Sequence, residues 1–228
     1  MHSYKYPHPS VTVDCVVFGL DEGVLKLLLI KRLLAPFKDK WALPGGFVLM
    51  DEDLETAALR ELKEETGVDD LYLEQFQAYG KPNRDPRERV ITIAYFAIVN
   101  LFKYTLKAST DAKEAEWYPV NDLPSLAFDH ENIVLNALSK LQNKVLREPL
   151  VFEFIPEKFT LPQVQFVYET ILQKKLDKRN FRKKLLATGL IEVLEEHETN
   201  VTHRAARFHL FNKDEWNKKS RGGLEFRI

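Results

Sequence analysis

Three glutamates in the first half of the chain have a spacing that suits metal-dependent phosphate chemistry. Glu61, Glu64 and Glu65 lie within five positions of one predicted helix. At 100° per residue, Glu64 and Glu65 lie about 60° and about 40° to either side of Glu61, so the three carboxylates share one helix face. Like charges this close destabilise a bare helix, whereas Mg²⁺ takes carboxylate oxygens as ligands. A cation held there would bridge to a pyrophosphate, and the alternative is a solvated acidic face.

The glutamates belong to a longer pattern that favours the first interpretation. Its fixed positions are Gly46, Glu52, Arg60, Glu61, Leu62, Glu64, Glu65, Gly67 and Val68. Their spacing resembles the complete Nudix box. By that resemblance the three glutamates hold metal ions, Mg²⁺ being the expected cofactor, with assistance from Gly46 and Glu52, while Arg60 fixes their orientation. The pattern does not indicate which group outside the box would activate water.

Charge is distributed unevenly along the 228 residues, a length that suits one large domain or two modest ones. Residues 1–149 hold 18 Lys and Arg against 23 Asp and Glu, whereas residues 150–228 hold 15 against 11. The opposite signs predict two domains with different chemistry. The first ten residues lack the apolar run of a signal peptide, and no segment has the roughly 18 apolar residues of a membrane helix. We therefore expect a cytoplasmic protein with no membrane partner.

Hydrophobic patterning predicts a mixed α/β domain over residues 1–149. The expected strands cover residues 10–18, 24–30, 71–80, 89–100 and 115–120. Asp51 or Asp53 would cap the helix that carries the glutamates, and Gly67 would end it. Asp129 would cap a second helix that ends near Val145. A short strand is expected between Pro149 and Pro156, and the domain boundary near residue 149.

Residues 150–228 have the pattern of a smaller winged helix-turn-helix domain. Thr160 and Asp177 are suited to capping two helices over residues 161–172 and 178–188, with Gly189 ending the second. Two strands, 190–196 and 205–211, would then form a hairpin. The order helix, turn, helix, hairpin describes a winged helix.

Basic residues on the second of these helices and on the hairpin predict contact with DNA. The candidates are Lys178, Arg179, Asn180, Arg182, Lys183, Arg204 and Arg207. Cations meet backbone phosphates, while Asn and Arg side chains also contact base edges in the major groove. The alternative is a solvated basic helix in an accessory domain. Basic residues on the hairpin, a second separate element, favour DNA.

The order of the two domains resembles that of the Nudix-related transcriptional regulators, the NrtR family. Segments such as WALPGGFV, NRDPRERV, LPSLAFDH and LDKRNFRKKLLATGLI have the family's order along the chain. The resemblance implies an α+β Nudix sandwich followed by a winged helix, and a homodimer that binds operator DNA. It also implies a small effector in the Nudix domain, ADP-ribose in some members and a sugar such as L-arabinose in others.

The loop NRDPRERV is the candidate effector site. Arg84, Arg87 and Arg89 are suited to gripping a phosphate or a polyol, although a loop of structural salt bridges is the alternative. Glu88 stands where relatives often have glycine. A carboxylate at this position would disfavour a pyrophosphate ligand, so Glu88 favours a neutral pentose as the effector. His130 is a further effector candidate, and the alternative is a histidine satisfied by its neighbours.

These observations lead to two hypotheses from different classes. The first is a transcriptional repressor of a sugar-utilisation or NAD-related operon, with a sensor over residues 10–148 and DNA binding over residues 150–211. The second is a Mg²⁺-dependent pyrophosphatase acting on ADP-ribose or another nucleoside diphosphate derivative. The intact box supports the second hypothesis, and a protein with both activities is also compatible with the sequence.

Overall fold

The computed structural model describes residues 5–21, 23–69, 71–101, 112–199, 205–221 and 226. The chain divides into two compact units, residues 1–138 and 139–228. The division lies upstream of the predicted boundary near residue 149, which stays a prediction. No helix among the described residues is both long and apolar enough to cross a membrane.

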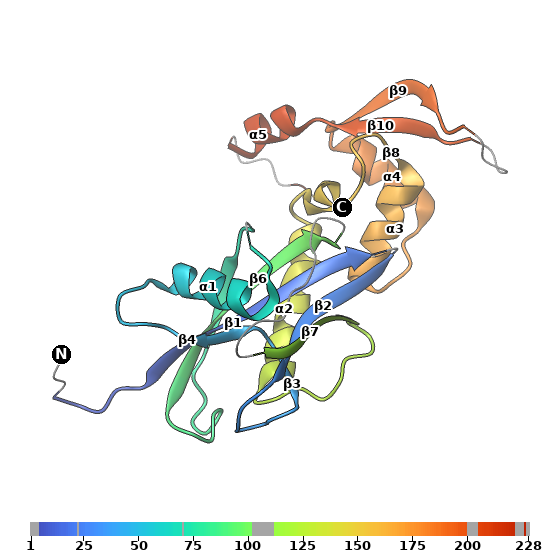
Figure 1. The fold of residues 1–228 in the computed structure, drawn as a ribbon. Coiled ribbons are helices and arrows are strands. Elements are labelled where there is room, and N and C mark those ends of the chain that lie inside the picture. Colours follow the sequence, from blue (N-terminus) through green and yellow to red (C-terminus); the bar gives the residue numbers. More distant parts are fainter. Residues whose placement is uncertain are drawn as a thin grey trace. The chain divides into compact units, whose positions relative to one another are not determined.

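A mixed sheet forms the centre of the N-terminal unit (Figure 1). Its strands are β1 (Ser10–Asp21), β2 (Val24–Arg32), β3 (Trp41–Ala42), β4 (Gly45–Phe47), β5 (Glu74–Tyr79), β6 (Val90–Asn100) and β7 (Ala112–Pro119). The main order is β3-β2-β1-β6-β5, with β4 paired to β1 and β7 paired to β2. Strands β1 and β6 are parallel, from Ser10 opposite Val90 to Leu20 opposite Asn100, and the other pairs are antiparallel. The five strands predicted from patterning are present.

Helix α1 (Leu54–Thr66) carries the glutamates, and its ends follow from local chemistry. Asp53 caps it by accepting a hydrogen bond from the Thr56 amide at 2.8 Å. Gly67 ends it with a φ of 74°, a left-handed conformation that favours glycine. The buried face of α1 packs its small and branched residues, Ala57, Ala58 and Leu62, into the sheet core. Glu65 is buried on the same side of the helix, whereas Glu64 is exposed. Helix α2 (His130–Val145) begins directly after Asp129.

The C-terminal unit has the predicted winged helix. Helices α3 (Leu161–Leu172) and α4 (Lys178–Ala187) are followed by β9 (Ile191–His197) and β10 (Arg207–Phe211). The short strand β8 (Phe159–Thr160) pairs with β10, which gives a three-stranded sheet in the order β8-β10-β9 (Figure 1). Asp177 caps α4 by accepting from the Asn180 amide at 2.7 Å. Gly189 follows the helix with a φ of 66°.

Two local predictions need correction. The segment between Pro149 and Pro156 is not a strand but the 3-10 helix η2 (Leu150–Glu153). A run of a few apolar residues does not distinguish the two, and a proline at each end favours a self-contained turn over a strand ladder. Helix α5 (Lys213–Arg221) was not predicted. Its signal was the Asn212 cap, whose side chain accepts from the Glu215 amide at 2.8 Å.

Candidate functional site

A cavity of about 310 Å³ opens beside the glutamate helix in the N-terminal unit. It brings together the box, the end of β2, the loop before β6 and the start of α2. Its polar and aromatic lining comprises Thr12, Asp14, Arg32, Phe47, Glu61, Glu65, Arg84, Asp85, Arg87, Phe128 and His130. Three of the four predicted effector residues, Arg84, Arg87 and His130, therefore lie in one cavity with two box glutamates.

Arg60 holds the outer carboxylates of the box. Its guanidinium makes two hydrogen bonds to Glu52, at 2.7 Å and 2.9 Å. It also donates to Glu61 at 2.8 Å and to Glu64 at 3.2 Å. Hydrogen bonds from Arg60 and from the Leu49 amide lower the pKa of Glu52 to about 2. One arginine thus relieves the repulsion among three of the four box carboxylates and orients them, as the resemblance implies.

Glu65 is the buried member of the box. Its side chain accepts a hydrogen bond from the Gly45 amide at 2.8 Å. Burial raises its pKa to about 8, since taking a carboxylate out of water disfavours the charged form. Burial also raises the pKa of Glu61. Position 46 requires glycine, because a Cβ there would overlap the Glu61 carboxylate.

The donor types of the box suit Mg²⁺, but their arrangement does not complete a cation site. Carboxylate oxygens are the ligands that this ion prefers. In the described part of the chain, however, no three His, Cys, Asp or Glu side chains converge as metal ligands. Glu64 is directed outward, with 53% of its side chain exposed, whereas Glu65 is buried. The glutamates are paired with Arg60 and a backbone amide rather than gathered around a common point.

Arg84 belongs to a buried ion-pair network. Its guanidinium lies 2.6 Å from Asp129 and 3.4 Å from Asp14, and only 4% of its side chain is exposed. His130 joins the same network: its Nδ1 accepts from the Leu43 amide at 2.9 Å, and its Nε2 lies 3.4 Å from Asp14. Burial lowers the pKa of His130, so the imidazole is neutral and Nε2 carries the proton. The structure thus satisfies His130 through its neighbours, the alternative that the sequence left open.

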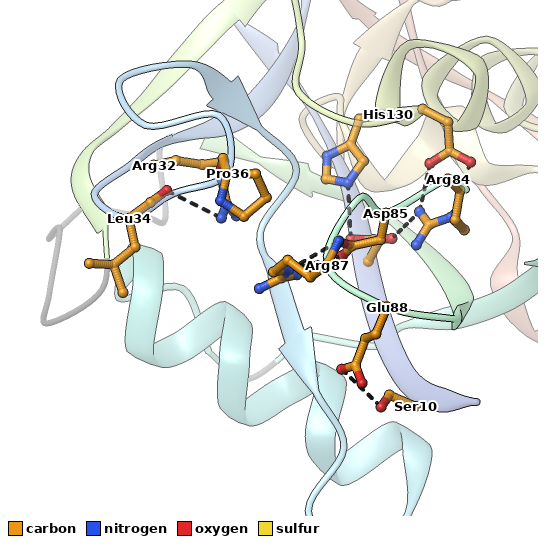
Figure 2. A network of polar contacts seen from close by, with 11 residues as sticks. Ser10, Arg32, Leu34, Pro36, Arg84, Asp85, Arg87, Glu88 and His130 are labelled. Carbon is orange, nitrogen blue, oxygen red and sulfur yellow. Dashed lines mark hydrogen bonds and ion pairs between the residues drawn. The ribbon is translucent and has the colours of Figure 1, made fainter. Parts of the chain in front are cut away.

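Arg32 and Arg87 are the cations that face the cavity around one aromatic ring. The Phe128 ring centroid lies 4.8 Å from the Arg32 guanidinium and 5.7 Å from that of Arg87. Arg87 is paired with Asp85 at 2.7 Å, with 39% of its side chain exposed. Arg32 instead donates to the carbonyl oxygens of Pro36 at 2.9 Å and Leu34 at 3.4 Å (Figure 2). No acidic side chain among the described residues forms an ion pair with Arg32.

The electrostatics of these two arginines favour an anion in the cavity. Burial lowers the pKa of Arg32 and repulsion from Arg87 lowers it further, while the carboxylates of Glu65, Asp85 and Asp14 partly oppose the shift. A negative group between them would relieve that repulsion. Sequence reasoning missed Arg32 and Phe128. The available signals were an arginine at the end of a predicted strand and the FDH segment; in the structure Phe128 adopts a φ of 53°, unusual for a bulky residue.

The remaining residues of the effector loop point elsewhere. Arg89 does not line the cavity and donates to the Val90 carbonyl at 3.3 Å. Glu88 accepts a hydrogen bond from Ser10 at 3.0 Å and also lies outside the lining (Figure 2). The position of Glu88 outside the lining gives no support to the expectation that it disfavours a pyrophosphate, which stays a prediction.

The C-terminal unit presents most of the predicted DNA-binding residues to solvent. Those with exposed side chains are Lys178, Arg179, Asn180, Lys183 and Arg207. Arg182 is partly buried. Arg204 lies outside the described residues. The basic face of α4 and the start of β10 therefore belong to one small unit that has a winged-helix fold.

Comparison with known proteins agrees with the two folds. The NUDIX domain model matches residues 8–137, and the model of the NrtR DNA-binding winged helix domain matches residues 151–211. The "ADPR responsive transcriptional repressor NtrR" of Acinetobacter baylyi is 40% identical over 191 residues, which cover 82% of this chain and 76% of that protein. The ADP-ribose pyrophosphatase of Methanocaldococcus jannaschii is 49% identical over 129 residues, 57% of this chain and 73% of the relative.

A solved structure is similar over nearly the whole chain. It is that of Shewanella oneidensis NrtR complexed with a 27mer DNA. Its sequence is 30% identical, the match covers 95% of this chain and 97% of that one, and the TM-score is 0.70.

Proposed function

The chain belongs to the NrtR family, with a NUDIX domain followed by the NrtR winged helix domain, and on this premise we propose that it is a DNA-binding transcriptional repressor controlled by ADP-ribose. The winged helix would bind operator DNA, and the effector would occupy the cavity beside the box. The similarity to an ADPR-responsive repressor supports this function.

One observation carries the choice of effector: Arg32 faces the cavity without an ion-pair partner among the described residues and lies against Phe128, with Arg87 on the same ring. Two guanidinium groups complement a pyrophosphate, which arginine recognises through charge-assisted hydrogen bonds. The aromatic rings of Phe128 and Phe47 offer an apolar surface for a base or a ribose. A neutral pentose would leave the repulsion between Arg32 and Arg87 in place. We therefore favour ADP-ribose over L-arabinose.

The test is calorimetric titration of the full chain with ADP-ribose and, separately, with L-arabinose. Arg32→Gln should weaken ADP-ribose binding about tenfold or more, because a hydrogen bond to a charged group contributes roughly 1.5–3 kcal/mol. Arg89→Gln is the matched control, since it removes the same charge from the loop before β6, outside the cavity lining. Equal losses for both variants, or tighter binding of L-arabinose than of ADP-ribose, would contradict the assignment.

Hydrolysis is the second candidate function, and the intact box together with 49% identity to an ADP-ribose pyrophosphatase favours it. A sensor needs its ligand to leave intact, because the difference in affinity between two states sets the response. We expect turnover of ADP-ribose with Mg²⁺ or Mn²⁺ to be absent or very slow. Turnover at about 1 s⁻¹ or more, abolished by Glu64→Gln, would establish the hydrolase instead.

A further inference from the structure

A second cavity, in the C-terminal unit, is distinct from the effector cavity. It has a volume of about 480 Å³ and lies where α3, α4 and β10 begin. Its lining comprises Leu161, Pro162, Lys178, Arg182, Ala205, Ala206, Arg207 and His209. Three of these residues are cations and none is acidic.

The positive charge of this cavity is not compensated within the described part of the unit. Lys178 and Arg182 lie one turn apart on α4, so both side chains project from the same side of the helix. The ion pairs found in this unit use other cations, namely Lys144, Lys158, Lys175, Lys213 and Lys219. Helix α3 also begins at the cavity, and the N-terminal end of its dipole adds positive potential.

Two buried polar atoms in the lining, Nε of Arg182 and Nδ1 of His209, have no hydrogen-bond partner among the described residues. The Arg182 Nε always carries a proton, so it is a buried donor that needs an acceptor. His209 is only 6% exposed. Leaving such a group unpaired costs roughly 1–3 kcal/mol, and an unpaired group in a native fold indicates a missing ligand or a strained site. Burial lowers the pKa of His209, backbone hydrogen bonds at Arg207 and Phe159 oppose that shift, and the charges of Arg207 and Arg182 add to it.

We propose that this cavity holds a backbone phosphate of duplex DNA, neutralised by Lys178, Arg182 and Arg207. The inference rests on the proposed DNA-binding function. It divides the candidate DNA-binding residues into those that contact phosphates and those that contact bases. Phosphate oxygens would accept from the Lys178 ammonium and from the terminal nitrogens of the Arg182 and Arg207 guanidinium groups. The exposed residues Arg179, Asn180 and Lys183, outside the cavity lining, would contact base edges and determine sequence preference.

The experiment measures affinity for two duplexes across a range of salt concentrations. One duplex is recovered from a random-sequence library by the full-length chain, and the other has the same composition in scrambled order. Arg207→Gln and Lys178→Gln should weaken binding to both duplexes by the same factor. Each should also flatten the slope of log affinity against log salt by about 0.9, the value for one phosphate contact. Arg179→Ala should instead reduce the ratio of the two affinities.

Lys218→Gln is the charge-matched control, because this exposed lysine on α5 lies in the same unit but outside the cavity. If it flattened the slope as much as Arg207→Gln, net charge alone would explain the effect and the phosphate site would be rejected. An unchanged slope in both cavity variants would also reject it. Circular dichroism checks folding, and Arg182→Gln is added only if it folds. If the wild-type chain recovered no duplex, the DNA-binding function itself would be contradicted.

Discussion

Arg84, Arg87 and Arg89 share one loop, and their surroundings give them three different roles. Arg84 is enclosed by Asp14 and Asp129, Arg87 reaches the cavity beside Asp85, and Arg89 is exposed. The side chain of Arg84 therefore stabilises the wall of the cavity rather than meeting a ligand directly.

The first consequence is a prediction about stability. Arg84→Ala should lower the free energy of unfolding by about 3–5 kcal/mol, because it leaves the buried carboxylate of Asp14 and the partly buried one of Asp129 without their cation. Arg89→Ala should change it by no more than about 0.5 kcal/mol, as expected for an exposed residue. Urea unfolding followed by fluorescence measures both. Equal and small effects would show that the Arg84 network does not support the fold.

The sequence alone identified the box glutamates, but it could not assign different roles to Arg84, Arg87 and Arg89. Glu61, Glu64 and Glu65 lie on one helix, where spacing fixes the face that each side chain occupies. The arginines lie on a loop, and their directions depend on residues distant in sequence, such as Asp14 and Asp129. Arg32 was missed for the same reason, because its neighbour Phe128 comes from a distant segment.

Helices were predicted well where their ends depend on adjacent residues. Asp53, Gly67 and Asp177 determine ends through contacts within a few positions of themselves. The order of strands was not predicted, since parallel pairing of β1 with β6 depends on the whole unit. Segment η2 was assigned wrongly because its pattern is too short to reveal a period.

The turn between α3 and α4 depends on one carboxylate. Glu169 accepts from the Leu176 amide at 3.0 Å, from Gln165 at 2.9 Å and from Lys175 at 3.0 Å. These hydrogen bonds, that from Leu176 foremost, lower the pKa of Glu169 from 4.5 to about 2. A carboxyl with a lowered pKa in the folded state contributes stability above pH 4.5, and that contribution is lost as the pH falls toward about 2.

Glu169→Gln should therefore loosen the helix-turn-helix most at neutral pH. Hydrogen exchange of residues 161–187, compared between the variant and the wild type at each pH, should differ clearly at pH 7. The difference should narrow as the pH falls below about 4.5. The matched variant Glu157→Gln changes an exposed glutamate in the same unit and should leave exchange unchanged. A difference that did not depend on pH would rule out the carboxylate as the cause.

For the whole molecule, we expect a homodimer. One helix-turn-helix covers a half-site of only a few base pairs, and two of them about 34–36 Å apart give useful specificity. Light scattering should give a mass of two 26.6 kDa chains, both free and on DNA. A monomer under both conditions would contradict the expected homodimer. If the chains were monomers in solution and paired only on DNA, the dimer would assemble at the operator instead of forming beforehand.

The parallel β1–β6 ladder has a consequence for how the chain folds during synthesis. Its register joins Ser10 to Val90 and Leu20 to Asn100, so β1 lacks its central partner until most of the N-terminal unit has left the ribosome. Non-local pairing of this kind must overcome loop-closure entropy first and is slow, whereas the helix pair α3–α4 forms through local contacts. Until β6 is synthesised, one edge of β1 remains open to pairing with other nascent chains, which makes aggregation through this strand a risk during synthesis.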